Sequence, residues 1–217
     1  MKVDKKDMLL YLVTDRRWLK EKTLPEVVKL AIENNVTFVQ LREKNLDYEK
    51  FKELAIEIKK ITDEYQIPFV INDNIKIAME IDADGVHVGQ KDLAAAKARQ
   101  LLGRDKILGV SVNTVEQAIE AEKAGADYLG LGSIFSTKSK LDAAGIDMDE
   151  VNKITKAVSI PAVGIGGINS ENIHLLKNSG LDGIAVISAI LAQEDIGKAA
   201  RNLYKLSKEV FSEGCNI

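Results

Sequence analysis

Cysteine is almost absent from this sequence of 217 residues, and a basic excess is missing altogether. The single cysteine, Cys215, stands in the tail SEGCNI, where it can neither pair within the chain nor sit beside a histidine. This excludes a disulfide scaffold and a cysteine-based zinc cluster, and it indicates a reducing compartment. Lysine and arginine number 30 against 33 acidic residues, so a net charge of -3 gives no overall field to hold a nucleic-acid backbone.

Long apolar runs are also missing. No segment approaches the roughly 20 apolar residues that span a bilayer, and the N-terminal MKVDKKD leads directly into LLYLVT, an apolar run too short for a signal peptide. We therefore expect a soluble, cytoplasmic protein without a membrane partner. Hydrophobic residues make up 46% of the sequence, and no linker or low-complexity block divides it. The prediction is a single domain over residues 1–217.

Eight short, β-rich apolar runs alternate with longer amphipathic stretches, which is typical of βα units that build a parallel sheet. One amphipathic stretch is FKELAIEIKKITDEY, whose apolar residues recur at steps of three and four. The runs are LLYLVT from Leu9, VTFVQLRE from Val36, IPFVIND from Ile67, DGVHVG from Asp84, ILGVSV from Ile107, DYLGLGSIF from Asp127, IPAVGIGG from Ile160 and DGIAVIS from Asp182.

A closed TIM barrel, (β/α)8, is the predicted fold class, and a doubly wound open sheet is the competing architecture. Eight strands of similar length that end in polar residues favour closure. The sequence GIGG followed by a final VIS run also matches the phosphate site that barrels often build after strands seven and eight.

Polar residues at the strand ends are the first candidates for chemistry, because the active face of a barrel lies there. In QLREK, Gln40, Arg42 and Lys44 are two apart and point to one side, while Val39 and Leu41 face the helices. An arginine inside an apolar strand is costly unless it meets an anion. We predict cations that converge on the barrel mouth; the alternative is a charged turn that starts the next helix.

Two carboxylates follow adjacent strands. Asn72 and Asp73 end the third run, and Asp92 lies in the loop after the fourth. Magnesium is typically held by one or two carboxylates with water and phosphate oxygens, whereas zinc would need histidine or cysteine ligands. Either aspartate could instead cap the helix that follows it.

Hydroxyl groups and a lysine follow the next strands. Ser111 offers a hydroxyl to an anion, although a helix cap is an equal alternative. Thr137, Ser139 and Lys140 stand in a loop rich in hydrogen-bond donors, which could clamp an anion or form a solvated loop.

A second anion site is predicted where Gly166 and Gly167 follow the seventh run and Ile187 with Ser188 opens a short helical turn after the eighth. The two glycines could equally serve a tight turn.

Neither histidine is a convincing general base. His87 in GVHVG is expected to be hydrogen-bonded inside the barrel, since no acid partner is evident, and His174 reads as helix surface. The absence of a nucleophile with its base argues against hydrolase triads. The reaction should depend on electrostatics more than on proton transfer.

These motifs together resemble the thiamine phosphate synthase family over nearly the whole chain. The motifs are YLVTD, QLREK, INDN, DGVHVGQKD, LGVSVNT, GLGSIFSTKSK, GIGGIN and VISAI, and their order and spacing carry the resemblance. The family is a group of barrel transferases that join a hydroxymethylpyrimidine diphosphate to a thiazole phosphate, plain or carboxylated. The resemblance thus implies Mg2+ as cofactor, these two small molecules as substrates, and diphosphate release.

The resemblance also implies roles for individual residues. The pyrimidine diphosphate would be bound by Gln40, Arg42, Lys44, Asn72, Ser111 and Lys140. The thiazole phosphate would meet Thr137, Ser139, Gly167, Ile187 and Ser188. Substrate contacts would also include Leu41, Glu43 and Lys138. The magnesium ligands would be Asp73 and Asp92, and the catalytic cations Arg42, Lys44 and Lys140.

Two departures from the family pattern concern one loop. The family often has proline where Ser133 and Ser136 stand, and threonine where Ser139 stands. Losing prolines should loosen the loop and affect its closure rather than the reaction type. A related thiazole tautomerase and a non-catalytic sensor of thiamine precursors are the alternative functions. An even-numbered homo-oligomer is the expectation for a soluble enzyme of this size.

Overall fold

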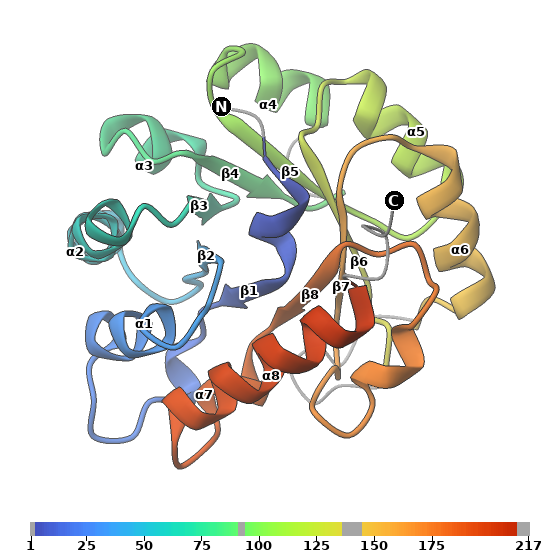
Figure 1. Cartoon of the computed structure of the whole chain (residues 1–217). Coiled ribbons are helices and arrows are strands. Elements are labelled where there is room, and N and C mark those ends of the chain that lie inside the picture. The colour runs from blue at the N-terminus through green and yellow to red at the C-terminus, as the bar shows by residue number, and fades with distance from the viewer. Residues whose placement is uncertain (1–2, 91–93, 136–144, 212–217) are drawn as a thin grey trace.

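A computed structural model describes residues 3–90, 94–135 and 145–211, in which eight parallel strands close into one barrel in sequence order (Figure 1). β1 pairs with both β2 and β8, which excludes the open sheet and confirms the predicted TIM barrel. The strands are β1 (Leu10–Val13), β2 (Phe38–Leu41), β3 (Phe69–Asn72), β4 (Gly85–Val88), β5 (Ile107–Val112), β6 (Tyr128–Leu131), β7 (Ala162–Ile165) and β8 (Gly183–Val186).

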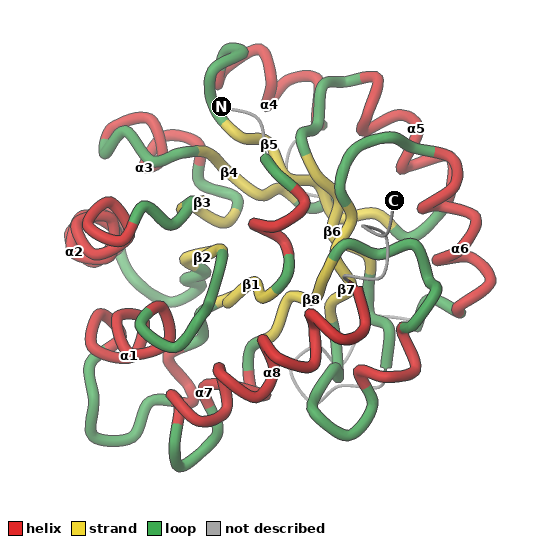
Figure 2. Tube along the Cα trace, in the orientation of Figure 1, coloured by secondary structure: helices red, strands yellow, loops and turns green. Residues whose placement is uncertain are grey.

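Helices form a ring outside the strands (Figure 2). The α-helices are α1 (Leu24–Ile32), α2 (Tyr48–Tyr65), α3 (Ile75–Glu80), α4 (Ala95–Leu102), α5 (Val115–Lys123), α6 (Met148–Ala157), α7 (Ser188–Leu191) and α8 (Ile196–Phe211). Three short 3-10 helices complete the described elements: η1 (Lys5–Met8), η2 (Arg16–Trp18) and η3 (Ile173–Leu176).

Alternation along the strands divides the core into two apolar layers. Leu10 and Leu12 of β1 face the helices, whereas Tyr11 and Val13 face the barrel interior. The outer layer includes the predicted apolar face of α2, where Phe51, Ala55 and Ile58 are buried. The interior cluster is Met8, Tyr11, Val13, Phe38, Val70, Ile107, Tyr128, Val163 and Ala185.

One hydrogen bond recurs around the barrel and involves the residue before each even-numbered strand. In each case the residue that precedes an even strand uses its side chain to accept an N–H at the start of the odd strand before it. The acceptor–donor pairs are Thr37 with Leu10 (2.9 Å), Asp84 with Phe69 (2.8 Å), Asp127 with Leu108 (2.8 Å) and Asp182 with Ala162 (2.9 Å). These bonds satisfy backbone donors that would otherwise be buried without a partner.

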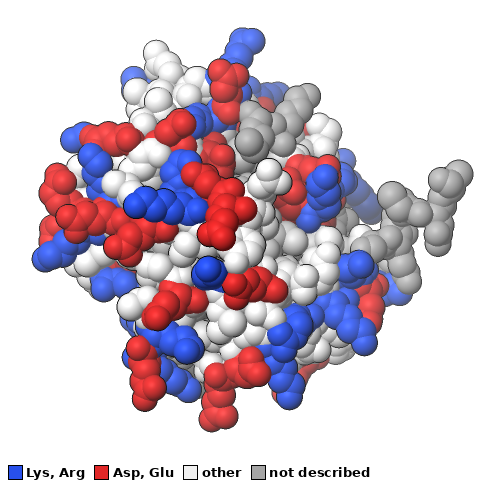
Figure 3. All heavy atoms as spheres, turned by 60° about the vertical axis from the view of Figure 1, so that its left-hand side comes forward, with Lys and Arg blue, Asp and Glu red and all other residues white. Residues whose placement is uncertain are grey.

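The amino-terminal end of the barrel is covered by η1, which lies across it with Met8 packed into the interior cluster (Figure 1). The carboxyl ends of the strands remain the side on which loops can build a site. On the face in Figure 3, acidic and basic side chains are intermingled rather than gathered by sign. Within the described ranges, no helix has the length and apolar character that a membrane span requires.

The strands have four to six residues each, and all but β5 are shorter than the apolar runs of the sequence. β2 ends at Leu41, so the prediction that Arg42 lies inside an apolar strand is wrong. The chain bends after Leu41 because Arg42 N donates to the Thr14 hydroxyl (3.0 Å) beyond the end of β1 instead of continuing the ladder.

Candidate active site at the carboxyl end of the barrel

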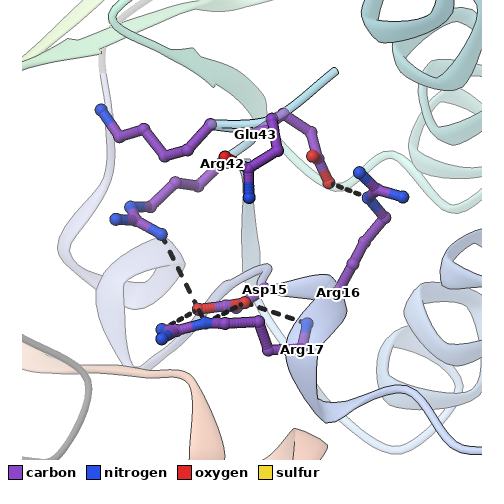
Figure 4. Close-up of a pocket in the computed structure, with 7 residues that line it drawn as sticks. Asp15, Arg16, Arg17, Arg42 and Glu43 are labelled. Carbon is purple, nitrogen blue, oxygen red and sulfur yellow. Dashed lines mark hydrogen bonds and ion pairs between the residues drawn. The ribbon is translucent and has the colours of Figure 1, made fainter.

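The loops after β1 and β2 enclose a cavity of about 240 Å3 at the carboxyl end of the barrel (Figure 4). Four cationic side chains and two carboxylates share it. The lining residues are Asp15, Arg16, Arg17, Arg42, Glu43, Lys44 and Asn45. Two of the three predicted catalytic cations, Arg42 and Lys44, are thereby brought to one cavity.

Asp15 is the anion that the arginines of this cavity meet within the chain. Its carboxylate is 6% exposed and accepts from Arg17 Nη2 at 2.6 Å, while Arg42 Nη1 lies 3.7 Å away (Figure 4). Burial alone would raise the pKa of Asp15, but hydrogen bonds from the side chain and backbone of Arg17, with the charges of Arg17 and Arg42, lower it below the ordinary value. Asp15 therefore stays ionised, holds the Arg17 guanidinium by hydrogen bonds and attracts that of Arg42 at longer range.

Arg42 is held at both ends. Its backbone N–H is bound by Thr14, which is fully buried, and its guanidinium faces Asp15. The sequence argument required an anion for Arg42, and in the described structure Asp15 is that anion at long ion-pair distance. A guanidinium held in this way retains donors for a phosphate group.

Lys44 and Asp73, predicted as a substrate cation and a metal ligand, contact each other directly. Lys44 Nζ lies 2.8 Å from Asp73 Oδ2, and the Asn72 amide also donates to that oxygen. Asp73 has a left-handed φ of 61° and donates its N–H to the His87 carbonyl at 2.9 Å. Aspartate is among the residue types that adopt this conformation most readily. The alternative of a helix cap fails, because Asn74 caps α3.

Ser111 lies at the end of β5 and is not a helix cap, because Thr114 caps α5. The Ser111 hydroxyl lies 2.9 Å from His87 Nε2, and the Ser111 backbone carbonyl accepts from Gln90 Nε2 at 2.7 Å. His87 Nδ1 lies 2.9 Å from the Tyr128 hydroxyl. His87 is thus hydrogen-bonded inside the barrel, as the sequence indicated, and it places Ser111 at the mouth.

The other residues predicted from QLREK face three different environments. Gln40 is 4% exposed and points inward, where its Nε2 donates to Tyr11 Oη at 2.6 Å. The Leu41 side chain is fully buried in the outer layer, so only its backbone could meet a substrate. Glu43 is paired with Arg16 (2.7 Å) at the cavity wall. Contact of these three residues with a substrate stays a prediction.

The predicted second anion site combines β7 and β8 loop residues. Gly166 and Gly167 have positive φ values of 103° and 65°. A side chain at Gly166 would collide with Ser133, so the close packing of this loop requires glycine there whether or not an anion binds. The Gly167 carbonyl is fixed by Asn172 Nδ2 at 2.9 Å, and Ser188 begins α7 as predicted.

Ser133, one departure from the family pattern, packs within the protein. It is 7% exposed, and its hydroxyl donates to the Phe135 carbonyl at 2.7 Å. Several predicted residues lie outside the described ranges: Asp92, Ser136, Thr137, Lys138, Ser139, Lys140 and Cys215.

Sequence reasoning missed Asp15, Arg16 and Arg17 as site residues. The available signal was their position, because three charged residues directly follow the first apolar run, where the barrel rule places functional side chains. The two arginines each pair with a carboxylate of the same cavity, which adds rigidity to the cationic wall.

The fold and this cavity define the class: a (β/α)8 barrel whose mouth presents cationic side chains, an arrangement that suits an anionic ligand. The model of the family described as thiamine monophosphate synthase matches residues 10–190. A thiamine-phosphate synthase of Ruminiclostridium cellulolyticum is 54% identical over 200 residues, which cover 92% of this chain and 95% of that one. One of Clostridium tetani is 52% identical over 197 residues, covering 91% and 94%.

A solved structure indicates the same family as these sequences. The thiamine phosphate pyrophosphorylase from Pyrococcus furiosus superposes with a TM-score of 0.87 and 40% identity, covering 95% of this chain and 98% of that one. The chain therefore belongs to the thiamine monophosphate synthase family. The resemblance read from its motifs and the prediction of a transferase are both confirmed.

Proposed function

We propose that this enzyme couples an aminopyrimidine diphosphate to a thiazole phosphate, plain or carboxylated, and releases thiamine phosphate and diphosphate, with CO2 as a third product when the thiazole is carboxylated. The observation that carries the proposal is the convergence of Arg42 and Lys44 on one cavity at the barrel mouth, next to Asp73. The names of the relatives support thiamine phosphate as the product. The two substrates are those that the family resemblance implies, and we propose that the diphosphate binds in this cavity.

Charge stabilisation is the task we assign to the cations. When the bond between the pyrimidine methylene carbon and the diphosphate oxygen breaks, both bonding electrons leave with the diphosphate. Arg42 and Lys44, with Lys140 as the third proposed cation, would offset the growing negative charge. The amino-substituted pyrimidine ring delocalises the cation that remains, and the thiazole nitrogen attacks it with its lone pair. Neither step removes a proton, so no protein base is required.

Asp15 and Asp73 have supporting tasks in this mechanism. Asp15 keeps the Arg42 guanidinium oriented toward the cavity before substrate arrives, which reduces the reorganisation needed in the transition state. Asp73 holds Lys44 at 2.8 Å in the same way. Gly167, Ile187 and Ser188 would place the thiazole phosphate, with Thr137, Lys138 and Ser139 as further contacts, so that its nitrogen lies in line with the breaking bond.

Mg2+ is the cofactor that the site suits. Asp73 contributes a carboxylate at a strand end, the type of ligand that magnesium takes together with phosphate oxygens, and its Oδ2 accepts from the Asn72 amide nitrogen and from Lys44 Nζ. Asp92 is the second proposed ligand. When bound, the ion would neutralise part of the diphosphate charge.

The test is a coupling assay with purified, chelator-treated protein and both phosphorylated precursors across a magnesium titration. We expect thiamine phosphate only when both precursors and Mg2+ are present. Full product without metal would remove Mg2+ from the account. Isomerisation of a thiazole phosphate alone would favour the tautomerase, and ligand binding without any turnover would favour the sensor.

A further inference from the structure

A chain of polar side chains crosses the barrel interior just below the mouth. Gln40 Nε2 donates to Tyr11 Oη at 2.6 Å, and Tyr11 Oη lies 2.7 Å from Tyr128 Oη. Tyr128 Oη lies 2.9 Å from His87 Nδ1, and His87 Nε2 lies 2.9 Å from Ser111 Oγ. We call these five residues, from β2, β1, β6, β4 and β5, the polar relay. All but Ser111 are classed as buried, at 8% exposure or less.

Two glycines make room for the relay. A side chain at Gly109 of β5 would collide with the Tyr128 ring, and a Cβ atom at Gly130 of β6 would lie 3.1 Å from His87 Cε1. The strands beside the two rings therefore carry no side chain at these positions. The relay occupies interior space that a barrel normally fills with apolar side chains.

The direction of the hydrogen bonds in the relay follows from counting hydrogens. Burial raises the pKa of both tyrosines above the ordinary value, so each hydroxyl keeps its one hydrogen. Because Gln40 donates to Tyr11 and each hydroxyl has one hydrogen, every hydrogen along this path finds an acceptor when Tyr11 donates to Tyr128 and Tyr128 donates to His87 Nδ1.

This direction fixes the two remaining groups of the relay. His87 then carries its hydrogen on Nε2 and donates it to Ser111 Oγ. The hydrogen of the Ser111 hydroxyl is left for another acceptor. If the Gln40 amide presented its oxygen to Tyr11 instead, every hydrogen bond of the relay would reverse its direction, and the Ser111 hydroxyl would donate its hydrogen to His87 Nε2.

We propose that Tyr11, Tyr128 and His87 are positioning residues that couple the orientation of the Gln40 amide to Ser111, so that Ser111 presents its hydrogen to the bound substrate. This rests on the proposed function only for the substrate's identity. An amino group that donates to the Gln40 amide oxygen selects the direction in which Ser111 donates to a ring nitrogen or diphosphate oxygen. The relay thereby favours an aminopyrimidine over an analogue that lacks the amino hydrogens.

The first test is the tautomer of His87 in the free, wild-type protein, read from the 15N chemical shifts of its ring nitrogens. The chain has two histidines, so His174→Gln identifies the His87 signals, and the exposed His174 is the internal control. At about pH 8.5, about two units above the ordinary histidine pKa, we expect a bare Nδ1 and a protonated Nε2. A hydrogen on Nδ1 would overturn the proposal.

The second test reverses the relay. In Gln40→Glu, measured where the 13C shift shows the introduced carboxylate to be ionised, the side chain can only accept. The His87 hydrogen should then move from Nε2 to Nδ1, while His174 stays unchanged. Adding Tyr11→Phe cuts the relay, and the shift should disappear. An unmoved His87 in the single variant, or an equal shift in the double variant, would refute coupling through the relay.

These spectra need no turnover, so they separate the relay from the proposed function. If Gln40→Glu does not fold, the wild-type spectrum still decides the direction of the hydrogen bonds. If His87 has the expected tautomer but the protein makes no thiamine phosphate, the relay is supported and the proposed function is refuted. If the protein makes thiamine phosphate but His87 has the opposite tautomer, the proposed function is supported and the relay is refuted.

Discussion

Replacing Arg42 by methionine tests the cationic cavity where the structure makes the clearest numerical prediction. Methionine keeps most of the apolar stem of the arginine and removes its guanidinium. A charge-assisted hydrogen bond to a phosphate oxygen is worth about 1.5–3 kcal/mol, and about 1.36 kcal/mol corresponds to a tenfold change in rate. We therefore expect kcat/KM for coupling to fall about 10- to 160-fold in Arg42→Met.

Stability should change little in the same variant. The ion pair between Arg42 and Asp15 is long, at 3.7 Å, and Asp15 keeps Arg17 at 2.6 Å. We expect the free energy of unfolding to stay within about 1 kcal/mol of wild type in urea denaturation. The matched control is Arg104→Met, an exposed arginine before β5 at the other end of the barrel.

Steady-state coupling assays at saturating magnesium measure the effect. Arg104→Met should keep wild-type kcat/KM. A loss below twofold in Arg42→Met, or equal losses in both variants, would show that the guanidinium of Arg42 does not act on the substrate.

Three further predictions concern aspartates. Asp73→Asn should raise the magnesium concentration needed for half-maximal coupling at least about tenfold with little change in stability, and an unchanged magnesium requirement would remove Asp73 as a ligand. Asp127→Ala should lower the free energy of unfolding by about 1–3 kcal/mol, because a buried strand N–H loses its acceptor. The exposed Asp63→Ala should change it by about 0.5 kcal/mol or less, and equal values would contradict the strand-start role. The lowered pKa of Asp15 contributes stability that is present above the unfolded pKa of about 3.9 and lost as pH falls through the folded pKa. The stability difference between wild type and Asp15→Asn should therefore shrink as pH drops below about 4, and a constant difference would contradict this.

The fold could be predicted from the sequence because its signals are periodic and local. Val39 and Leu41 alternate with Gln40, and the structure places the first two outward and the third inward. The sequence shows Asp84, Asp127 and Asp182 only as polar residues at the start of apolar runs. Their acceptor role depends on a neighbouring strand that lies 15 to 20 residues earlier in the chain, which the sequence pattern alone does not place.

The site could be predicted only in part, because its contacts join different loops. Arg42 and Lys44 were identified from their spacing, but their partners Asp15 and Asp73 come from β1 and β3 loops. The end of β2 also depends on Thr14, so the position of Arg42 outside the strand was not accessible from periodicity. The sequence predicted that His87 lies inside the barrel. It could not predict the hydrogen bond between His87 Nε2 and Ser111, because that contact depends on the register of β4 and β5.

Diphosphate and thiamine phosphate measured together in one reaction test the central claim most directly. Purified protein with both precursors and Mg2+ should form the two products in equal amounts. When the thiazole phosphate is omitted, no thiamine phosphate should form and diphosphate release should not exceed one equivalent per enzyme. Diphosphate release without thiamine phosphate, or no release from a folded protein that binds both precursors, would contradict a coupling reaction at the barrel mouth.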